Sequence, residues 1–226
     1  MNMDGRHTVL VVDDHPLFRK GVMQLLGMEP SIEVIGEAGN RAQALDLVRS
    51  REPDLILLDL NLKAESGLDV LAALKAEDPS RRVVMLTVSD AAEDLIGAIR
   101  AGADGYLLKD MEPEHLLDRV RAALAGETVI GEALAARLAV ALRQEAQDTA
   151  SGARRELAQL TEREREVLHC LADGQSNKRI ARSLSITEGT VKLHVRNLMK
   201  KLNFRSRVDA AVWMARDILP QVRARL

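Results

Sequence analysis

The chain has 226 residues, of which 46% are hydrophobic and 29% are charged, and its formal net charge is −2. This composition is typical of a folded globular protein and excludes a disordered chain, and no apolar run approaches the roughly 20 residues of a membrane span. The single cysteine cannot form an internal disulfide and the N-terminus lacks an apolar signal segment. We therefore predict a cytoplasmic protein without membrane contact.

Charge is distributed unevenly along the chain. Residues 1–127 contain 14 basic and 23 acidic residues, a net charge of −9, whereas residues 157–226 contain 14 basic and 7 acidic residues, a net charge of +7. This asymmetry favours two domains with different partners, and a polyanion is the expected partner of the basic one.

Short apolar runs and amphipathic segments alternate through the first 125 residues. Four consecutive apolar residues, 55–58, lie between Asp54 and Asp59, which is typical of a strand buried on both faces. The same pattern predicts further strands at 8–12, 32–35, 82–88 and 105–108, and helices at 16–27, 41–50, 66–76, 91–101 and 113–125.

Strict alternation of strands and helices predicts an α/β fold, a doubly wound, five-stranded parallel sheet with helices on both faces. Right-handed crossovers favour the flavodoxin-like strand order 2-1-3-4-5, with a switch point between the first and third strands. Residues 1–127 are therefore predicted to form one domain.

The alternation stops after residue 127. The Ala- and Leu-rich residues 131–143 predict a connecting helix, and the small polar residues 144–152 predict a flexible linker, so 128–156 is interpreted as a linker region. Residues 157–226 are predicted to be all helical. There, Thr161 and Glu164 form a capping box, and Thr187 and Ser206 are expected helix caps.

Polar groups of different kinds follow the strands of the first domain. Asp13 and Asp14 end the first strand and Asp59 ends the third, so the switch point should bring the three carboxylates together. Such crowding is unfavourable unless a hard cation such as Mg²⁺ relieves it, and the backbone carbonyl of Asn61 is a further candidate ligand.

Two more groups complete this predicted site. Strand four ends at the hydroxyl of Thr87, and Lys109 follows strand five. Each residue alone has a common structural role as a cap or a solvated side chain, but their joint position at strand ends favours phosphoryl transfer to Asp59.

The basic end of the chain has the pattern of a helix-turn-helix. Residues 176–184 and 188–202 are the two predicted helices, and Lys192, Arg196 and Lys200 form a basic stripe along the second. A basic stripe is often only solvated, but together with the net charge of this region it favours docking in the major groove of double-stranded DNA.

The first domain resembles the receiver domain of two-component response regulators, from its segments at 11–15, 57–61, Thr87 and 106–109. The resemblance implies that Asp59 accepts phosphate from a sensor histidine kinase, with Asp13, Asp14 and Asn61 around Mg²⁺. It also implies that Thr87 and Lys109 bind the phosphoryl oxygens and that Tyr106 repositions with Thr87. Lys63 departs from the family, which usually has proline at that position.

Residues 157–218 resemble the LuxR/FixJ-type DNA-binding domain, through the motifs at 160–168 and 180–194. Receiver and DNA-binding domain together are the arrangement of the NarL/FixJ family, and the resemblance is strongest to its nitrate- and nitrite-responsive members. It implies that Lys192, Leu193 and Arg196 reach bases. Contacts to the DNA backbone are expected from Asn177, Lys178, Thr190 and Lys201.

The resemblance therefore predicts a transcription factor and not an enzyme. Its expected partners are a sensor histidine kinase, double-stranded DNA, a second copy of the chain on DNA and RNA polymerase. The acidic receiver is expected to cover the basic recognition helix until Asp59 is phosphorylated.

Three alternatives remain open at this point. The first is a member of the same family that responds to another signal. The second is a Mg²⁺-dependent phosphatase with Asp59 as nucleophile, which Asn61 disfavours because such enzymes need a second acid there. The third is a sensor of small autoinducers, which the scarcity of aromatic residues disfavours.

Overall fold

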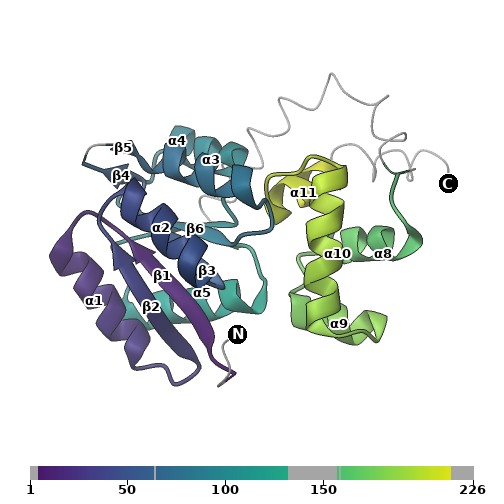
Figure 1. Cartoon of the computed structure of the whole chain (residues 1–226), viewed down its shortest axis with the longest axis horizontal. Coiled ribbons are helices and arrows are strands. Elements are labelled where there is room, and N and C mark those ends of the chain that lie inside the picture. Colours follow the sequence, from purple (N-terminus) through teal and green to yellow (C-terminus); the bar gives the residue numbers. More distant parts are fainter. Residues whose placement is uncertain (1–4, 64, 132–156, 158, 215–226) are drawn as a thin grey trace.

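The computed structural model describes residues 5–63, 65–131, 157 and 159–214, which form two units (Figure 1). The first unit is built around a sheet, and the second is helical. Most of the predicted connecting helix and all of the predicted flexible linker, at 132–156, lie outside the described residues, as do residues 215–226. No helix in the described part is long and apolar enough to cross a membrane.

The sheet of the first unit is parallel and has six strands, in the order β2-β1-β3-β6-β7-β8. Its first five positions have the predicted 2-1-3-4-5 order, but the predicted number of five strands is wrong. The sixth strand is a two-residue edge strand inside the region interpreted as a linker, where Val129 pairs with Gly105. The strands are β1 (His7–Val12), β2 (Ile32–Ala38), β3 (Leu55–Leu58), β6 (Val83–Thr87), β7 (Gly105–Leu108) and β8 (Val129–Ile130).

Helices cover both faces of this sheet, and each face has its own buried apolar cluster. Residues of α1 and α5 pack on one face, and residues of α2, α3 and α4 pack on the other. Apolar side chains at helical spacing on one side of each helix explain this division. The helices are α1 (Pro16–Gly27), α2 (Arg41–Arg51), α3 (Gly67–Glu77), α4 (Ala92–Ala101) and α5 (Pro113–Ala125).

A small hairpin follows β3, which the sequence analysis did not predict. It joins β4 (Asn61–Leu62) to β5 (Glu65–Ser66) in antiparallel pairing. Gly67 comes next, and a Cβ at this position would lie 2.1 Å from the carbonyl oxygen of Asp59. Only glycine permits this close approach of two backbone segments, so the hairpin is held directly beside Asp59.

The described residues of the second unit form four helices around a core of their own. They are α8 (Glu162–Ala172), α9 (Asn177–Leu184), α10 (Glu188–Lys201) and α11 (Arg207–Trp213). The predicted capping box of Thr161 and Glu164 is present, and Thr187 and Ser206 cap α10 and α11 as predicted. In the core, Phe204 and Trp213 lie with ring centroids 5.4 Å apart.

The two units are in contact. Val208 of α11 is only 5% exposed and belongs to the apolar cluster on the α3–α4 side of the sheet. The guanidinium of Arg205 donates to the carbonyl of Arg100 at the end of α4, at 3.1 Å. The helical unit therefore docks where α4 ends and β3, β6 and β7 begin (Figure 1).

Candidate functional site

Three carboxylates converge at the carboxyl ends of β1 and β3. Asp13, Asp14 and Asp59 are all buried, and one ligand atom from each lies within 4.8 Å of the others and of a nitrogen of His15. Parallel strands β1 and β3 are neighbours in the sheet, so residues that follow their ends become neighbours too. This is the arrangement expected from the strand order.

Lys109 supplies the positive charge at the centre of this cluster. Its Nζ lies 2.7 Å from Asp59 Oδ2 and 2.7 Å from Asp13 Oδ2, and it stands 4.7 Å above the ring of Phe18. The Lys109 side chain is 9% exposed, so these charge-assisted hydrogen bonds form largely away from water.

Asp59 is a buried carboxylate among other charged groups. Burial raises the pKa of Asp59, and the nearby Asp13 adds to this, while the ammonium of Lys109 opposes both effects. Asn61 donates its backbone N–H to Asp59 Oδ1 at 3.3 Å, which fixes the carboxylate and brings the Asn61 backbone beside it. The Asn61 side chain itself is exposed.

The backbone of Ser89 connects a hydroxyl at the end of β6 with a hydroxyl on β7. Thr87 is fully buried, and its Oγ1 accepts from the backbone N–H of Ser89 at 3.2 Å. The hydroxyl of Tyr106, also fully buried, donates to the Ser89 carbonyl at 3.0 Å. Burial raises the pKa of Tyr106 to about 12, so the phenol remains a donor. Ser89 thus joins the two predicted switch residues.

Ser89 and His15 also contact the predicted site residues, although the sequence predicts no role for either. Ser89 contacts Thr87 and Tyr106 through its backbone, which gives no signal in the sequence, and its Oγ donates to Asp94 Oδ2 at 2.5 Å. His15 Nδ1 lies 2.9 Å from Asp14 Oδ1. The exposed Lys63 reaches within 3.9 Å of Asp14 Oδ2.

The acidic cluster fits a hard divalent cation. Its ligand atoms are carboxylate oxygens, the type that Mg²⁺ prefers. Asp14 Oδ1 is buried and accepts no hydrogen bond in the described part of the chain, although His15 Nδ1 is near. A buried carboxylate oxygen without a donor is costly, and a cation bound there would remove that cost.

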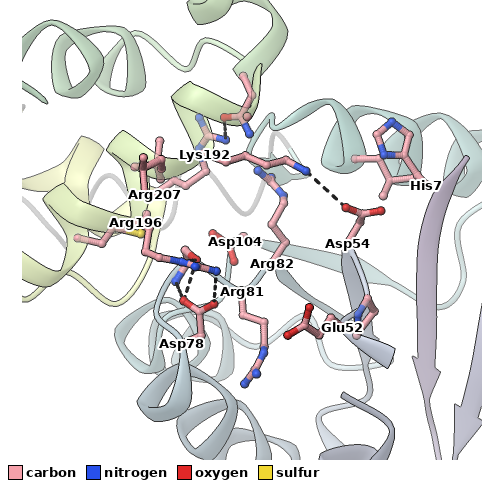
Figure 2. A pocket seen from close by; sticks show the side chains of 18 residues that line it. His7, Glu52, Asp54, Asp78, Arg81, Arg82, Asp104, Lys192, Arg196 and Arg207 are labelled. Carbon is pink, nitrogen blue, oxygen red and sulfur yellow. Dashed lines mark hydrogen bonds and ion pairs between the residues drawn. The ribbon is translucent and has the colours of Figure 1, made fainter. Parts of the chain in front are cut away.

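In the helical unit, the predicted base-reading residues lie on α10 and face the first unit. Lys192 Nζ lies 3.4 Å from Asp54 Oδ1, and Arg196 Nη2 lies 3.0 Å from Asp78 Oδ2 (Figure 2). Leu193, 55% exposed, lines the same cavity between the units. Carboxylates of the first unit therefore pair with two of the residues predicted to read bases.

The four residues predicted to contact the DNA backbone differ in their surroundings. Lys178 is exposed on α9. Asn177 Oδ1 accepts from Arg207 at 3.0 Å, and the hydroxyl of Thr190 pairs with that of Thr187. Lys201 Nζ lies 2.6 Å from the buried carboxylate of Glu164, so Lys201 also supports the fold of this unit.

Comparisons with known proteins agree with this geometry. Residues 9–121 match the response regulator receiver domain, and residues 158–214 match the luxR family of bacterial regulatory proteins. The chain belongs to the NarL/FixJ family of two-component response regulators. Its members are DNA-binding transcription factors, so a sensor kinase and DNA are the partner classes of this response regulator.

Relatives of this response regulator match it along nearly its whole length. The nitrate/nitrite response regulator NarL of Escherichia coli K12 is 50% identical over 93% of this chain and 95% of its own length. NarP of the same organism, also a nitrate/nitrite response regulator, is 51% identical over 90% and 92%. A LuxR-family response regulator structure from Aurantimonas sp. SI85-9A1 aligns with a TM-score of 0.57 at 29% identity, covering 60% of this chain and 97% of that one.

Proposed function

We propose that Asp59 accepts a phosphoryl group from a sensor histidine kinase, and that this modification releases α10 from the receiver so that it can bind DNA. The observation that carries the first half is the 2.7 Å contact between Lys109 Nζ and Asp59 Oδ2 inside a buried acidic cluster. In this proposal, residues 1–127 are the receiver, 128–156 the linker and 157–226 the DNA-binding domain.

The chemistry follows from the residues around Asp59. A carboxylate oxygen of Asp59 attacks the phosphorus of the kinase phosphohistidine, the P–N bond breaks and the imidazole leaves with the bonding electron pair. Lys109 can pair with an oxygen of the transferred phosphoryl group, because its ammonium already lies beside Asp59. Mg²⁺ bound by Asp13, Asp14, Asp59 and the Asn61 carbonyl would neutralise the charge of the phosphoryl group.

Thr87, Ser89 and Tyr106 form the proposed switch. In the unphosphorylated chain, Thr87 Oγ1 is engaged by the Ser89 amide, and Tyr106 holds the Ser89 carbonyl. If the Thr87 hydroxyl turns to bind the phosphoryl group, the Ser89 segment must move. Because this segment leads directly into α4, whose far end contacts Arg205, a displacement can reach the docked helical unit.

The DNA contacts of the released unit follow the residue types on α10 and α9. Lys192, Leu193 and Arg196 are the proposed base readers. Asn177, Lys178, Thr190 and Lys201 are the proposed contacts to the DNA backbone. Two copies of the chain would then occupy two half-sites, and RNA polymerase is a proposed further partner.

The proposed signal is nitrate or nitrite, because NarL and NarP, each about half identical to this chain, are nitrate/nitrite response regulators. A protein that binds the bacterial chromosome acts in the cytoplasm, which is the proposed location. Neither role requires the chain to turn over a substrate as an enzyme. Chromatin-binding maps of cells grown with and without nitrate test the signal, and identical maps would point to a different one.

Labelling by a small phosphodonor tests the phosphoacceptor. Wild-type protein should become phosphorylated in Mg²⁺ and not in excess chelator, and Asp59→Asn should not be labelled, because an amide is not a competent nucleophile. Asp110→Asn, which changes an exposed acid that follows Lys109, is the matched control and should label normally. Stable label on Asp59→Asn would assign phosphorylation to another residue.

A DNA titration tests the release of α10. Phosphorylated full-length protein and the fragment 157–226 should both bind target DNA more tightly than the unphosphorylated chain at equal salt. Lys192→Ala and Arg196→Ala should each lose about 1–3 kcal/mol of discrimination between sequences, whereas Lys178→Ala should weaken binding to all sequences alike. Equal affinity of fragment and unphosphorylated chain would refute masking.

A further inference from the structure

A cavity of about 450 Å³ separates the DNA-binding unit from the receiver (Figure 2). Its walls come from both units. The receiver side includes Asp54, Asp78 and Arg82, and the DNA-binding side includes Lys192, Arg196 and Arg207. Its size is within the range of small-molecule sites.

Most charges around this cavity have a partner of opposite sign. Lys192 pairs with Asp54, and Arg196 pairs with Asp78. The carboxylate of Asp104 is also engaged, because Oδ2 accepts from the buried Lys75 ammonium at 2.7 Å and from the Val83 amide at 3.0 Å.

Arg207 is different, because it is buried and its hydrogen bonds go to neutral oxygens. It is 6% exposed, and its guanidinium donates to the neutral oxygens of Asn177 at 3.0 Å and Gln175 at 3.2 Å. In the described part of the chain it forms no ion pair with a carboxylate. A buried cation held only by neutral acceptors is unfavourable unless an anion approaches it.

Arg82, on the opposite wall of the cavity, also has a guanidinium that is only partly satisfied. Its Nη2 donates to the Glu127 carbonyl at 2.8 Å, but its buried Nε has no acceptor in the part of the chain that the structure describes. Figure 2 shows the Arg82 side chain extending across the cavity toward the DNA-binding unit.

The guanidinium of Arg82 also acts on Arg207. Burial, followed by the field of Arg82, lowers the pKa of Arg207 to about 9, and burial lowers the pKa of Arg82 as well. The carboxylate of Asp104 opposes both effects, and that of Glu127 opposes the effect on Arg82. The hydrogen bonds of Asp104 to Lys75 and Val83 are already formed. Docking of the two units therefore buries the Arg207 guanidinium close enough to that of Arg82 for the two positive charges to repel.

We propose that this cavity binds a small anion bearing a phosphate or sulfate group, held between Arg82 of the receiver and Arg207 of the DNA-binding unit. Guanidinium forks match the spacing of oxyanion oxygens and donate two hydrogen bonds at once. The guanidinium of Arg82, whose Nε has no acceptor in the described part of the chain, supplies one such fork. The source of the group is either inorganic or the phosphate of a nucleotide, since the cavity has room for more than one phosphate.

The anion would regulate DNA binding, a step that rests on the masking proposed above. Because its ligands come from both units, it can bind only while they are docked. Ligands that bind one of two conformations stabilise it, so the anion would favour the form in which α10 faces the receiver.

Isothermal titration calorimetry on the unphosphorylated full-length chain tests the site. Sulfate, inorganic phosphate and ADP are titrated separately into chloride buffer, with total ionic strength constant. At least one probe should bind with a stoichiometry of one. Arg82→Gln and Arg207→Gln should each weaken that binding by at least about tenfold, since each removes a charged donor.

Arg81→Gln is the matched control. Arg81 lines the same cavity, but it already pairs with Glu77 at 3.1 Å and donates to the Leu74 carbonyl. Its replacement should leave anion affinity within about twofold of wild type. If Arg207→Gln fails to fold by circular dichroism, Arg82→Gln decides. Absence of saturable binding by all three probes, or equal losses in Arg81→Gln and Arg82→Gln, would overturn the site.

The regulatory step has its own measurement. At constant ionic strength, the anion that binds should weaken the affinity of the wild-type chain for target DNA, and Arg82→Gln should show a smaller effect. Saturable anion binding with no change in DNA affinity would overturn the regulatory step alone. If the fragment and the unphosphorylated chain bind DNA equally well while the full chain still binds the anion, the result would count against the proposed function and leave the anion site intact.

Discussion

Arg196 Nη2 of the recognition helix lies 3.0 Å from Asp78 Oδ2 of the receiver, and Arg196 Nε lies 3.3 Å from the hydroxyl of Ser80. A side chain predicted to read bases therefore has receiver oxygens as its partners. These residues precede β6, whereas Asp59 follows β3, so the docked helix lies at the opposite end of the sheet from the acidic cluster.

Removing one carboxylate at this contact should undock α10 from the receiver in a fraction of the molecules. Asp78→Asn keeps an oxygen for Ser80 but loses the charge that faces Arg196. Because the Arg196 side chain is half exposed, the gain in DNA affinity of the unphosphorylated chain should be modest, up to about fivefold. Asp118→Asn, an equal change of charge at an exposed site on α5, should have no effect in the same anisotropy assay.

Gly102 should matter for docking as well as for the end of α4. It caps the helix at φ +103°, and a Cβ there would lie 2.8 Å from the Arg205 carbonyl. Gly102→Ala should lose roughly 1 kcal/mol or more of folding stability and should bind DNA more tightly without phosphate. Gly174→Ala shares the left-handed backbone but meets nothing within 4 Å. A similar gain in DNA affinity from Gly174→Ala would mean that strain, and not contact with Arg205, is responsible.

Lys109 should stabilise the acidic cluster when Mg²⁺ is absent. Lys109→Met leaves Asp13 and Asp59 without their shared ammonium, so thermal or urea unfolding in chelator should show a loss of about 1–3 kcal/mol. Addition of Mg²⁺ should recover part of this loss, because the cation replaces the missing charge. Lys20→Met, at an exposed position on α1, should be neutral under both conditions. If Mg²⁺ does not reduce the loss of stability in Lys109→Met, the result would argue against a cation at this cluster.

Glu164 should make the stability of the DNA-binding unit depend on pH. Burial alone would raise the pKa of Glu164, but the hydrogen bonds from Lys201 and Thr161 outweigh it and lower the pKa. The carboxylate then stabilises the fold above the ordinary glutamate pKa, and this contribution is lost as pH falls through the lowered value. Glu164→Gln should lose about 1–2 kcal/mol at neutral pH.

Urea unfolding followed by Trp213, the single tryptophan of the chain and part of the core of this unit, measures the effect. The difference between wild type and Glu164→Gln should shrink as pH falls below the glutamate range. Glu166→Gln, which alters an exposed pair with Arg163, should follow the wild-type profile. Parallel profiles for wild type and Glu164→Gln would show that the carboxylate does not titrate with folding.

The pattern of apolar residues was enough to predict most strands and helices of the receiver. The runs at 8–12 and 55–58 predicted β1 and β3, because strands buried on both faces must be continuously apolar. The sheet order then followed from chain connectivity and handedness. The same signal fails for Val129–Ile130 and for the hairpin at 61–66, where two-residue strands are too short to show any period and form only through their neighbours.

The convergence of the polar residues that follow β1, β3, β6 and β7 could also be predicted from the sequence alone, because a parallel sheet brings those strand ends to one edge. What only the tertiary structure decided are contacts between residues far apart in the chain. Ser89 joins Thr87 to Tyr106 through backbone atoms, which leave no mark in the sequence. The pairing of Arg196 with Asp78 and the burial of Arg207 against neutral oxygens depend on how the two units meet, and local residue patterns do not encode that geometry.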